Sequence, residues 1–250
     1  MLRAWGGFKA AAGADRRNRG GVGLGRRGMD DQDPTGPPPR REPVFNAPWP
    51  IVVLIAALVG AHVARLLADA PPDPYALTHE DLAGGRWSAL LSYQFVHANW
   101  MHLVLNSLFS LAFGTPTARF LGASLRGALA FAGFFLTCGV ISALGYALLH
   151  PHEPWALVGA SGAASGLMAA AARLIDGQGW LGGLRGRSVI GMTVSWIAIN
   201  VVFGTLGITP GAAGLPVAWE AHIIGYFAGL LLIGVFGRLA GSFSDHRQEH

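Results

Sequence analysis

The sequence has few charged side chains and almost no cysteine. Only 13% of its 250 residues are charged, about half the share typical of a soluble globular domain. Its one cysteine, Cys138, lies in an apolar run, so no disulfide can form within the chain. These two shortages exclude an ordinary soluble domain and a small disulfide-linked secreted scaffold.

What the sequence has instead is long apolar runs. Hydrophobic residues make up 52% of the chain, and several runs approach the ~20 residues that an α-helix needs to cross a bilayer. The predicted fold is an all-α membrane protein, a bundle of six transmembrane helices. The expected spans are residues 50–67, 101–117, 125–149, 161–175, 189–208 and 219–239.

Three parts of the chain differ in composition. Residues 1–48 are rich in Gly, Arg, Asp and Pro, a composition that cannot bury enough apolar area to offset the entropy of ordering. We therefore expect a disordered cytoplasmic tail there. It does not resemble a signal peptide, because no apolar core follows the early charges. Residues 49–240 are the expected six-helix domain, and residues 241–250 a short cytoplasmic tail.

The arginines predict the orientation of the spans. The net charge of +4 reflects arginines in the tail and in alternate loops, a pattern of membrane orientation rather than nucleic-acid binding. By the positive-inside rule both termini are cytoplasmic. The expected location is a bacterial inner membrane, so the lipid bilayer is an expected partner. The sequence does not indicate an oligomeric state. The arginines assigned to the cytoplasmic side are Arg119, Arg126, Arg173, Arg185, Arg187, Arg238 and Arg247, against Arg65 and Arg86 on the other side.

A serine and a histidine lie at matching depth in two of these spans. Ser161, within Gly159-Ala160-Ser161-Gly162, is roughly 18 Å above the arginine that ends its span, and His222 is roughly 24 Å above the end of the last span, at 1.5 Å per residue. A histidine within a membrane segment is costly and needs a functional reason. In contact, the two side chains would form a nucleophile and its general base.

Further polar groups share this level. His102 and Asn106, four apart on one face of the second span, can both donate hydrogen bonds to a developing oxyanion. The fourth span is short and starts at Ser161, so residues 151–160 must enter the membrane around protein or a water-filled cavity. A helix N-terminus at Ser161 adds free N–H groups and a positive dipole end.

Glycine pairs predict that two of the spans pack closely. Gly162 and Gly166 are four apart, as are Gly225 and Gly229, and small residues at this spacing let helix backbones approach each other in lipid. Close approach of the fourth and sixth spans is what a Ser161–His222 hydrogen bond requires.

These motifs resemble those of the rhomboids, the intramembrane serine proteases. The match is His97-x4-His102-x3-Asn106, Gly159-x-Ser161-Gly162 and Ala221-His222-x2-Gly225-x3-Gly229, in order and on the second, fourth and sixth spans. The resemblance implies a six-transmembrane-helix rhomboid-like bundle with a catalytic dyad of Ser161 and His222. It also implies an oxyanion hole formed by His102, Asn106 and the Ser161 N–H, and a structural role for His97. The implied substrates are transmembrane proteins that are cut near the outer interface.

The chain departs from this family at Ser165, where many rhomboids carry an aromatic that stacks on the catalytic histidine. We expect the Ser165 hydroxyl to hydrogen-bond the His222 ring, the alternative being a role in packing alone. Asn200, on the fifth span, is expected to bridge helices. The serines at 107, 110, 142 and 195 are expected to bond their own helix backbones.

Other interpretations stay open. Ser161 alone is explained better as a small packing residue than as a nucleophile, and His222 alone as a buried, hydrogen-bonded histidine or a proton relay. His97 and His102 diverge on a helix and have no acidic partner at their depth, so no metal is expected, and no cofactor either. The predicted function is an intramembrane serine endopeptidase. One alternative is an inactive rhomboid-like protein that binds transmembrane clients. The other is a small transporter, which would require acidic partners at depth or inverted repeats, and the sequence has neither.

Overall fold

The computed structural model describes residues 47–71, 73–152, 154–207 and 217–243, which are mostly helical. Nearly all of the two predicted tails, residues 1–46 and 244–250, lies outside the described residues. So does the predicted end of the fifth span at residue 208. Each expected span corresponds to one long helix. These helices are α1 (Trp49–Leu67), α4 (Trp100–Leu121), α5 (Leu125–Leu149), α6 (Ser161–Asp176), α7 (Arg187–Leu206) and α8 (Trp219–Ala240).

The structure corrects the end of the second span. We expected it to end at residue 117 and placed Arg119 in a loop, but α4 continues through Pro116 to Leu121, so Arg119 lies in its last turn. Proline removes one backbone hydrogen bond from a helix. Helix α4 nevertheless continues past Pro116 and ends only where Gly122 takes a φ of 91°.

Four of the long helices are long and apolar enough to cross a membrane: α1, α5, α7 and α8. The protein is therefore an integral membrane protein. Helix α6 has only 16 residues, and the 22-residue α4 carries polar side chains such as His102 and Asn106. The expectation of six spans therefore stays a prediction.

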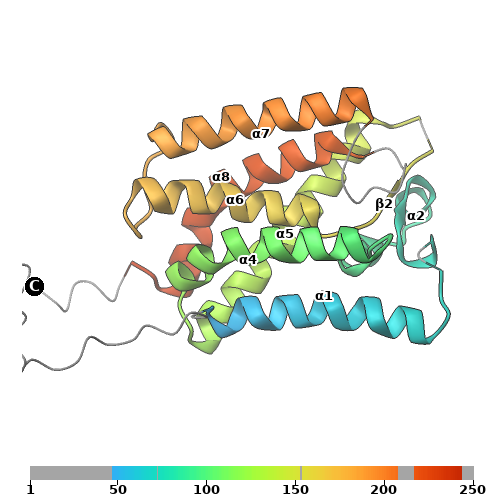
Figure 1. Cartoon of the computed structure of the whole chain (residues 1–250), viewed down its shortest axis with the longest axis horizontal. Coiled ribbons are helices and arrows are strands. Elements are labelled where there is room, and N and C mark those ends of the chain that lie inside the picture. The colour runs from blue at the N-terminus through green and yellow to red at the C-terminus, as the bar shows by residue number, and fades with distance from the viewer. Residues whose placement is uncertain (1–46, 72, 153, 208–216, 244–250) are drawn as a thin grey trace, which may run out of the picture. The chain divides into compact units, whose positions relative to one another are not determined.

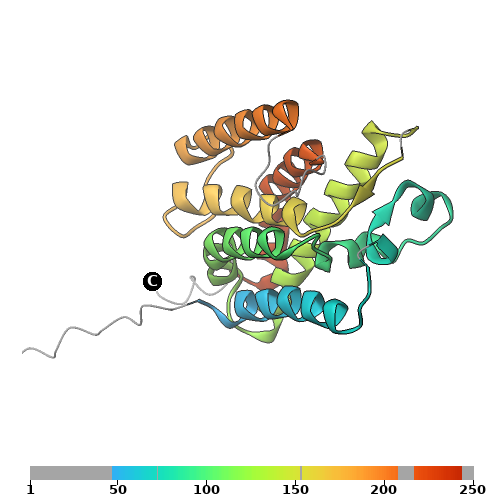
Figure 2. The same cartoon turned by 45° about the vertical axis from the view of Figure 1, so that its right-hand side comes forward.

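Helix α6 is the centre of the packing. It contacts α4, α5, α7 and α8, and most of its buried residues are alanines and glycines, which allow this close approach. Helices α1 and α7 lie at opposite edges of the bundle in both views (Figures 1 and 2). Along α7 the buried residues are Val189 and Asn200 alone among those described.

Helices α6 and α8 meet backbone against backbone. A methyl group on Gly225 would lie 2.1 Å from the Gly162 carbonyl oxygen, and one on Gly229 would lie 2.2 Å from the Gly166 carbonyl oxygen. Real Cβ atoms do not approach oxygen so closely, so these positions admit glycine alone at this helix separation. The expected role of the two glycine pairs is therefore confirmed.

The connection from α1 to α4 is built of short elements that reach the segment before Ser161. They are η1 (Asp73–Tyr75), β1 (Leu77–Thr78), α2 (His79–Ala83), α3 (Ala89–Ser92) and η2 (Tyr93–Phe95). Strand β1 pairs antiparallel with β2 (Ala156–Leu157), with Leu77 opposite Leu157 and Thr78 opposite Ala156.

This connection is stabilised by its own polar contacts. Thr78 and Asp81 form a reciprocal capping box at the start of α2. Arg86 Nε donates to Asp81 Oδ1 at 2.6 Å. The hydrogen bond and positive charge of Arg86 lower the pKa of the Asp81 carboxyl, so this contact persists throughout the neutral pH range.

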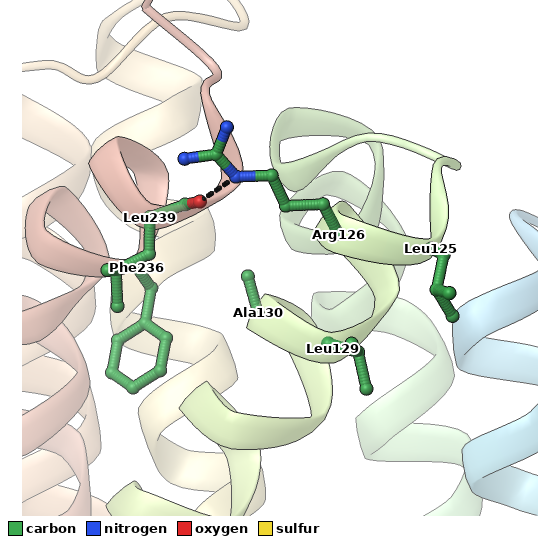
Figure 3. A pocket seen from close by; sticks show the side chains of 6 residues that line it. All are labelled: Leu125, Arg126, Leu129, Ala130, Phe236 and Leu239. Atoms are coloured by element: carbon green, nitrogen blue, oxygen red, sulfur yellow. Dashed lines mark hydrogen bonds between the residues drawn. The ribbon is translucent and has the colours of Figure 1, made fainter.

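At the far end of α8 from His222, α5 and α8 border a shallow apolar groove (Figure 3). Arg126 Nε donates to the Leu239 carbonyl across it. Leu239 is 17 residues beyond His222, or about 25 Å along the helix. The groove is therefore remote from the Ser161–His222 level. It is lined by Leu125, Arg126, Leu129, Ala130, Phe236 and Leu239.

We expect Gly229→Ala to lower the melting temperature of the purified protein in detergent, because its methyl group meets the Gly166 backbone rather than a movable side chain. Overpacking of this kind typically costs about 1–3 kcal/mol. Gly60→Ala on α1 is the matched control, since a methyl group there meets nothing within 4 Å. A melting temperature of Gly229→Ala equal to that of the control would contradict backbone contact between α6 and α8.

Candidate functional site

The structure brings Ser161 and His222 into hydrogen-bond contact. Ser161 is the first residue of α6, and His222 lies in the first turn of α8. Their Oγ and Nε2 atoms are 2.8 Å apart, although 61 residues separate them in the chain. Both side chains are half-buried rather than sealed from solvent. This contact is the arrangement of a hydroxyl nucleophile with a general base.

The chain turns sharply just before Ser161. Gly159 has a φ of 106°, a value that a residue with a Cβ rarely adopts. Its N–H donates to the Tyr93 carbonyl at 2.9 Å, and the Tyr93 hydroxyl donates to the Gly139 carbonyl of α5 at 2.7 Å. Together with the β1–β2 pair, these bonds fix the direction from which the chain enters α6.

The N-terminus of α6 presents backbone donors at the serine. No side chain caps this helix, and its first N–H groups have no partner within the helix. His102 and Asn106 lie against the same turn. A methyl group on Gly159 would lie 2.7 Å from His102 Nε2 and 3.6 Å from Asn106 Nδ2. The expected grouping of these two side chains near Ser161 is therefore present in the structure.

His97 lies behind His102 in a buried group of rings. It is fully buried, and its ring centroid lies 5.2 Å from that of His102 and 6.4 Å from that of His62 on α1. The His97 carbonyl accepts a hydrogen bond from Arg65 at 3.2 Å. These contacts join α1 to the start of α4, which fits the expected structural role of His97. In the described part of the chain no group of acidic, histidine or cysteine side chains has the geometry of a metal site.

The expectation for Ser165 is wrong. Its hydroxyl donates to the carbonyl of Ser161, one turn back on α6, at 2.7 Å. The second nitrogen of the His222 ring, Nδ1, lies 2.8 Å from Oδ1 of Asn200 on α7. Asn200 was expected to bridge helices, and it does, but no residue pattern indicates that its partner is His222.

A second correction concerns Ser142. We expected it to bond its own helix, but it donates from α5 to the carbonyl of Ala221 on α8 at 2.6 Å. This contact lies one residue before His222, and the same hydroxyl occupies the space that a side chain on Gly162 would fill. Ser107 and Ser110 also differ from expectation, because their buried hydroxyls have no hydrogen-bond partner among the residues described.

Comparison with known families agrees with the resemblance in the motifs. The Rhomboid domain family matches residues 84–239, well over half of the chain. The chain belongs to the rhomboid family. The matched region contains His97, His102, Asn106, Ser161 and His222. No curated protein sequence matches the chain significantly.

We expect Ser142→Ala to destabilise this rhomboid, because it leaves the Ala221 carbonyl without its cross-helix donor. Loss of a buried neutral hydrogen bond typically costs about 1 kcal/mol. Ser110→Ala is the control, since the hydroxyl that it removes is buried with no partner among the residues described. Thermal unfolding of both variants in detergent measures the difference. A Ser142→Ala variant as stable as Ser110→Ala would show that the contact contributes nothing.

Proposed function

We propose that this rhomboid is an intramembrane serine endopeptidase that cleaves transmembrane proteins, with Ser161 as nucleophile and His222 as general base. The observation that carries the proposal is the 2.8 Å contact between Ser161 Oγ and His222 Nε2. Serine is a weak nucleophile at neutral pH and becomes reactive when an adjacent base takes its proton.

The reaction proceeds in two acyl-transfer steps. As Ser161 Oγ attacks the scissile carbonyl carbon, its proton passes to His222 Nε2, and a tetrahedral intermediate forms. His222 then gives this proton to the leaving amine as the peptide C–N bond breaks, which leaves an acyl-enzyme on Ser161. A water molecule, deprotonated by the same ring, hydrolyses the ester and restores the hydroxyl.

The oxyanion of the intermediate is stabilised at the N-terminus of α6. The uncapped backbone N–H of Ser161, together with the side chains of His102 and Asn106 around Gly159, supplies preorganised donors there. Such donors stabilise charge that develops only in the transition state, and they act strongly where water is scarce.

The bilayer sets the substrate class. Substrates of a rhomboid protease are transmembrane segments, and the half-buried Ser161 lies at one end of the short helix α6. With the arginine-rich ends of α4, α6 and α8 on the cytoplasmic side, Ser161 and His222 lie toward the opposite surface. We place the protein in a bacterial inner membrane with both termini in the cytoplasm, and cleavage near the outer interface.

The first test is a fluorophosphonate probe, which reacts with activated serines. We expect it to label the wild-type protein and not Ser161→Ala. Both Ser161→Ala and His222→Ala should abolish cleavage of a reporter transmembrane substrate in liposomes, and the double variant should be little worse, because the two groups act as a unit. A wild-type protein that binds transmembrane segments but is neither labelled nor active would instead be an inactive client-binding rhomboid.

The second test separates the donors from the dyad. His102→Ala and Asn106→Ala should each lower kcat, typically by about 100- to 1,000-fold for one lost oxyanion donor, with little change in KM. Rates measured at saturating substrate check this. If both substitutions together leave kcat within a few-fold of wild type, these side chains are not the oxyanion donors.

A further inference from the structure

We propose that Asn200 is a third member of this site, a positioning residue that holds His222 in the tautomer with the proton on Nδ1. The proposal rests on the function proposed above for Ser161 and His222. Its direct support is the 2.8 Å separation of Asn200 Oδ1 and His222 Nδ1.

The hydrogen bonds of Asn200 define which end of its amide faces the ring. Its Nδ2 donates at 2.9 Å to the backbone carbonyl of Trp196, one turn earlier on α7. A carbonyl can only accept a hydrogen bond, so the NH2 group must face Trp196 and the amide oxygen must face His222.

The same reasoning continues through the ring to the nucleophile. The amide oxygen can only accept, so Nδ1 of His222 must carry the proton. In a neutral imidazole Nε2 is then unprotonated. It can therefore accept the hydroxyl proton of Ser161 at the observed 2.8 Å. Asn200 thus selects the one neutral tautomer in which His222 can act as a base.

Helix α7 also supplies an aromatic neighbour for the ring. The Trp196 ring centroid is 6.2 Å from that of His222, with the planes 34° apart. Trp196 in turn packs against Phe109 of α4, with centroids 5.2 Å apart. Residues four apart share a helix face, so Trp196 and Asn200 approach the ring from one side. The Ser165 hydroxyl of α6 donates to the Ser161 carbonyl instead, and the hydrogen-bond partner of Nδ1 comes from α7.

An amide suits this location better than a carboxylate. Asn200 is only 5% exposed, and an ionised carboxylate at such a position in a membrane is costly. Glu220, two residues before His222, faces His150 at the C-terminal cap of α5 instead, with Oε1 3.3 Å from Nε2. The Asn200 oxygen accepts from Nδ1–H both before and after Nε2 takes the serine proton, so one contact serves the whole cycle.

The test compares Asn200→Leu, which keeps the size and removes the hydrogen bonds, with Thr205→Val as control. Among the residues described, the Thr205 hydroxyl bonds carbonyls of its own helix alone, those of Val201 and Val202. We expect Asn200→Leu to lower kcat about tenfold or more with KM nearly unchanged, and Thr205→Val to match wild type. Saturation kinetics on a reporter transmembrane substrate in liposomes measures both constants. A folded Asn200→Leu variant with kcat within twofold of wild type overturns the proposal.

The tautomer gives a second readout that a role in packing alone would not change. Nitrogen-15 NMR of histidine-labelled protein in micelles, with His222→Ala to assign the signal, should show the Nδ1–H tautomer in wild type and its loss in Asn200→Leu. If the leucine variant does not fold, the wild-type tautomer still decides, because an Nε2–H tautomer overturns the proposal. A wild-type protein that is not labelled by fluorophosphonate would refute the protease function while leaving this measurement valid.

Discussion

The backbone contact between α6 and α8 determines the geometry of the whole site. The carbonyls of Gly162 and Gly166 lie where side chains on Gly225 and Gly229 would have to be, so the two helix axes cannot be further apart without losing this contact or closer without a clash. In lipid there is no hydrophobic drive to hold helices together, and dispersion at such close contacts is a main source of stability. The residue before Gly162 is Ser161, so the contact also fixes the distance from Ser161 to α8.

The connection between α1 and α4 provides the second constraint. Without it the backbone groups of the chain before α6 would need other hydrogen-bond partners. The β1–β2 pair and the hydrogen bond from Gly159 to Tyr93 satisfy these groups. The same bonds hold Gly159 at its positive φ. The same contacts therefore order this long connection and position Ser161.

Depth along a helix can be calculated from sequence, whereas rotation about its axis and side-chain rotamers cannot. Counting residues placed Ser161 and His222 at one level, and glycine spacing indicated which helices meet; the structure agrees on both. The partner of Asn200 depends on how α7 is rotated against α8, and the direction of the Ser142 hydroxyl depends on one torsion angle. Residue spacing carries neither quantity. The position of Arg119 was missed for another reason, because α4 ends at its C-cap glycine, Gly122, and not before the first charged residue.

The parts of the site are held with unequal strength. Ser161 is fixed by backbone packing and by the hydrogen-bonded connection, both deep in the bundle. Helix α7 lies at the edge, and beside Asn200 its buried residue among those described is Val189, near the end where Asp176 accepts the N–H groups of Ser188 and Val189. Interhelical hydrogen bonds in membranes average only about 0.6 kcal/mol, comparable to thermal energy. The position of the nucleophile therefore rests on backbone contacts between α6 and α8, whereas the orientation of the base rests on one hydrogen bond from α7.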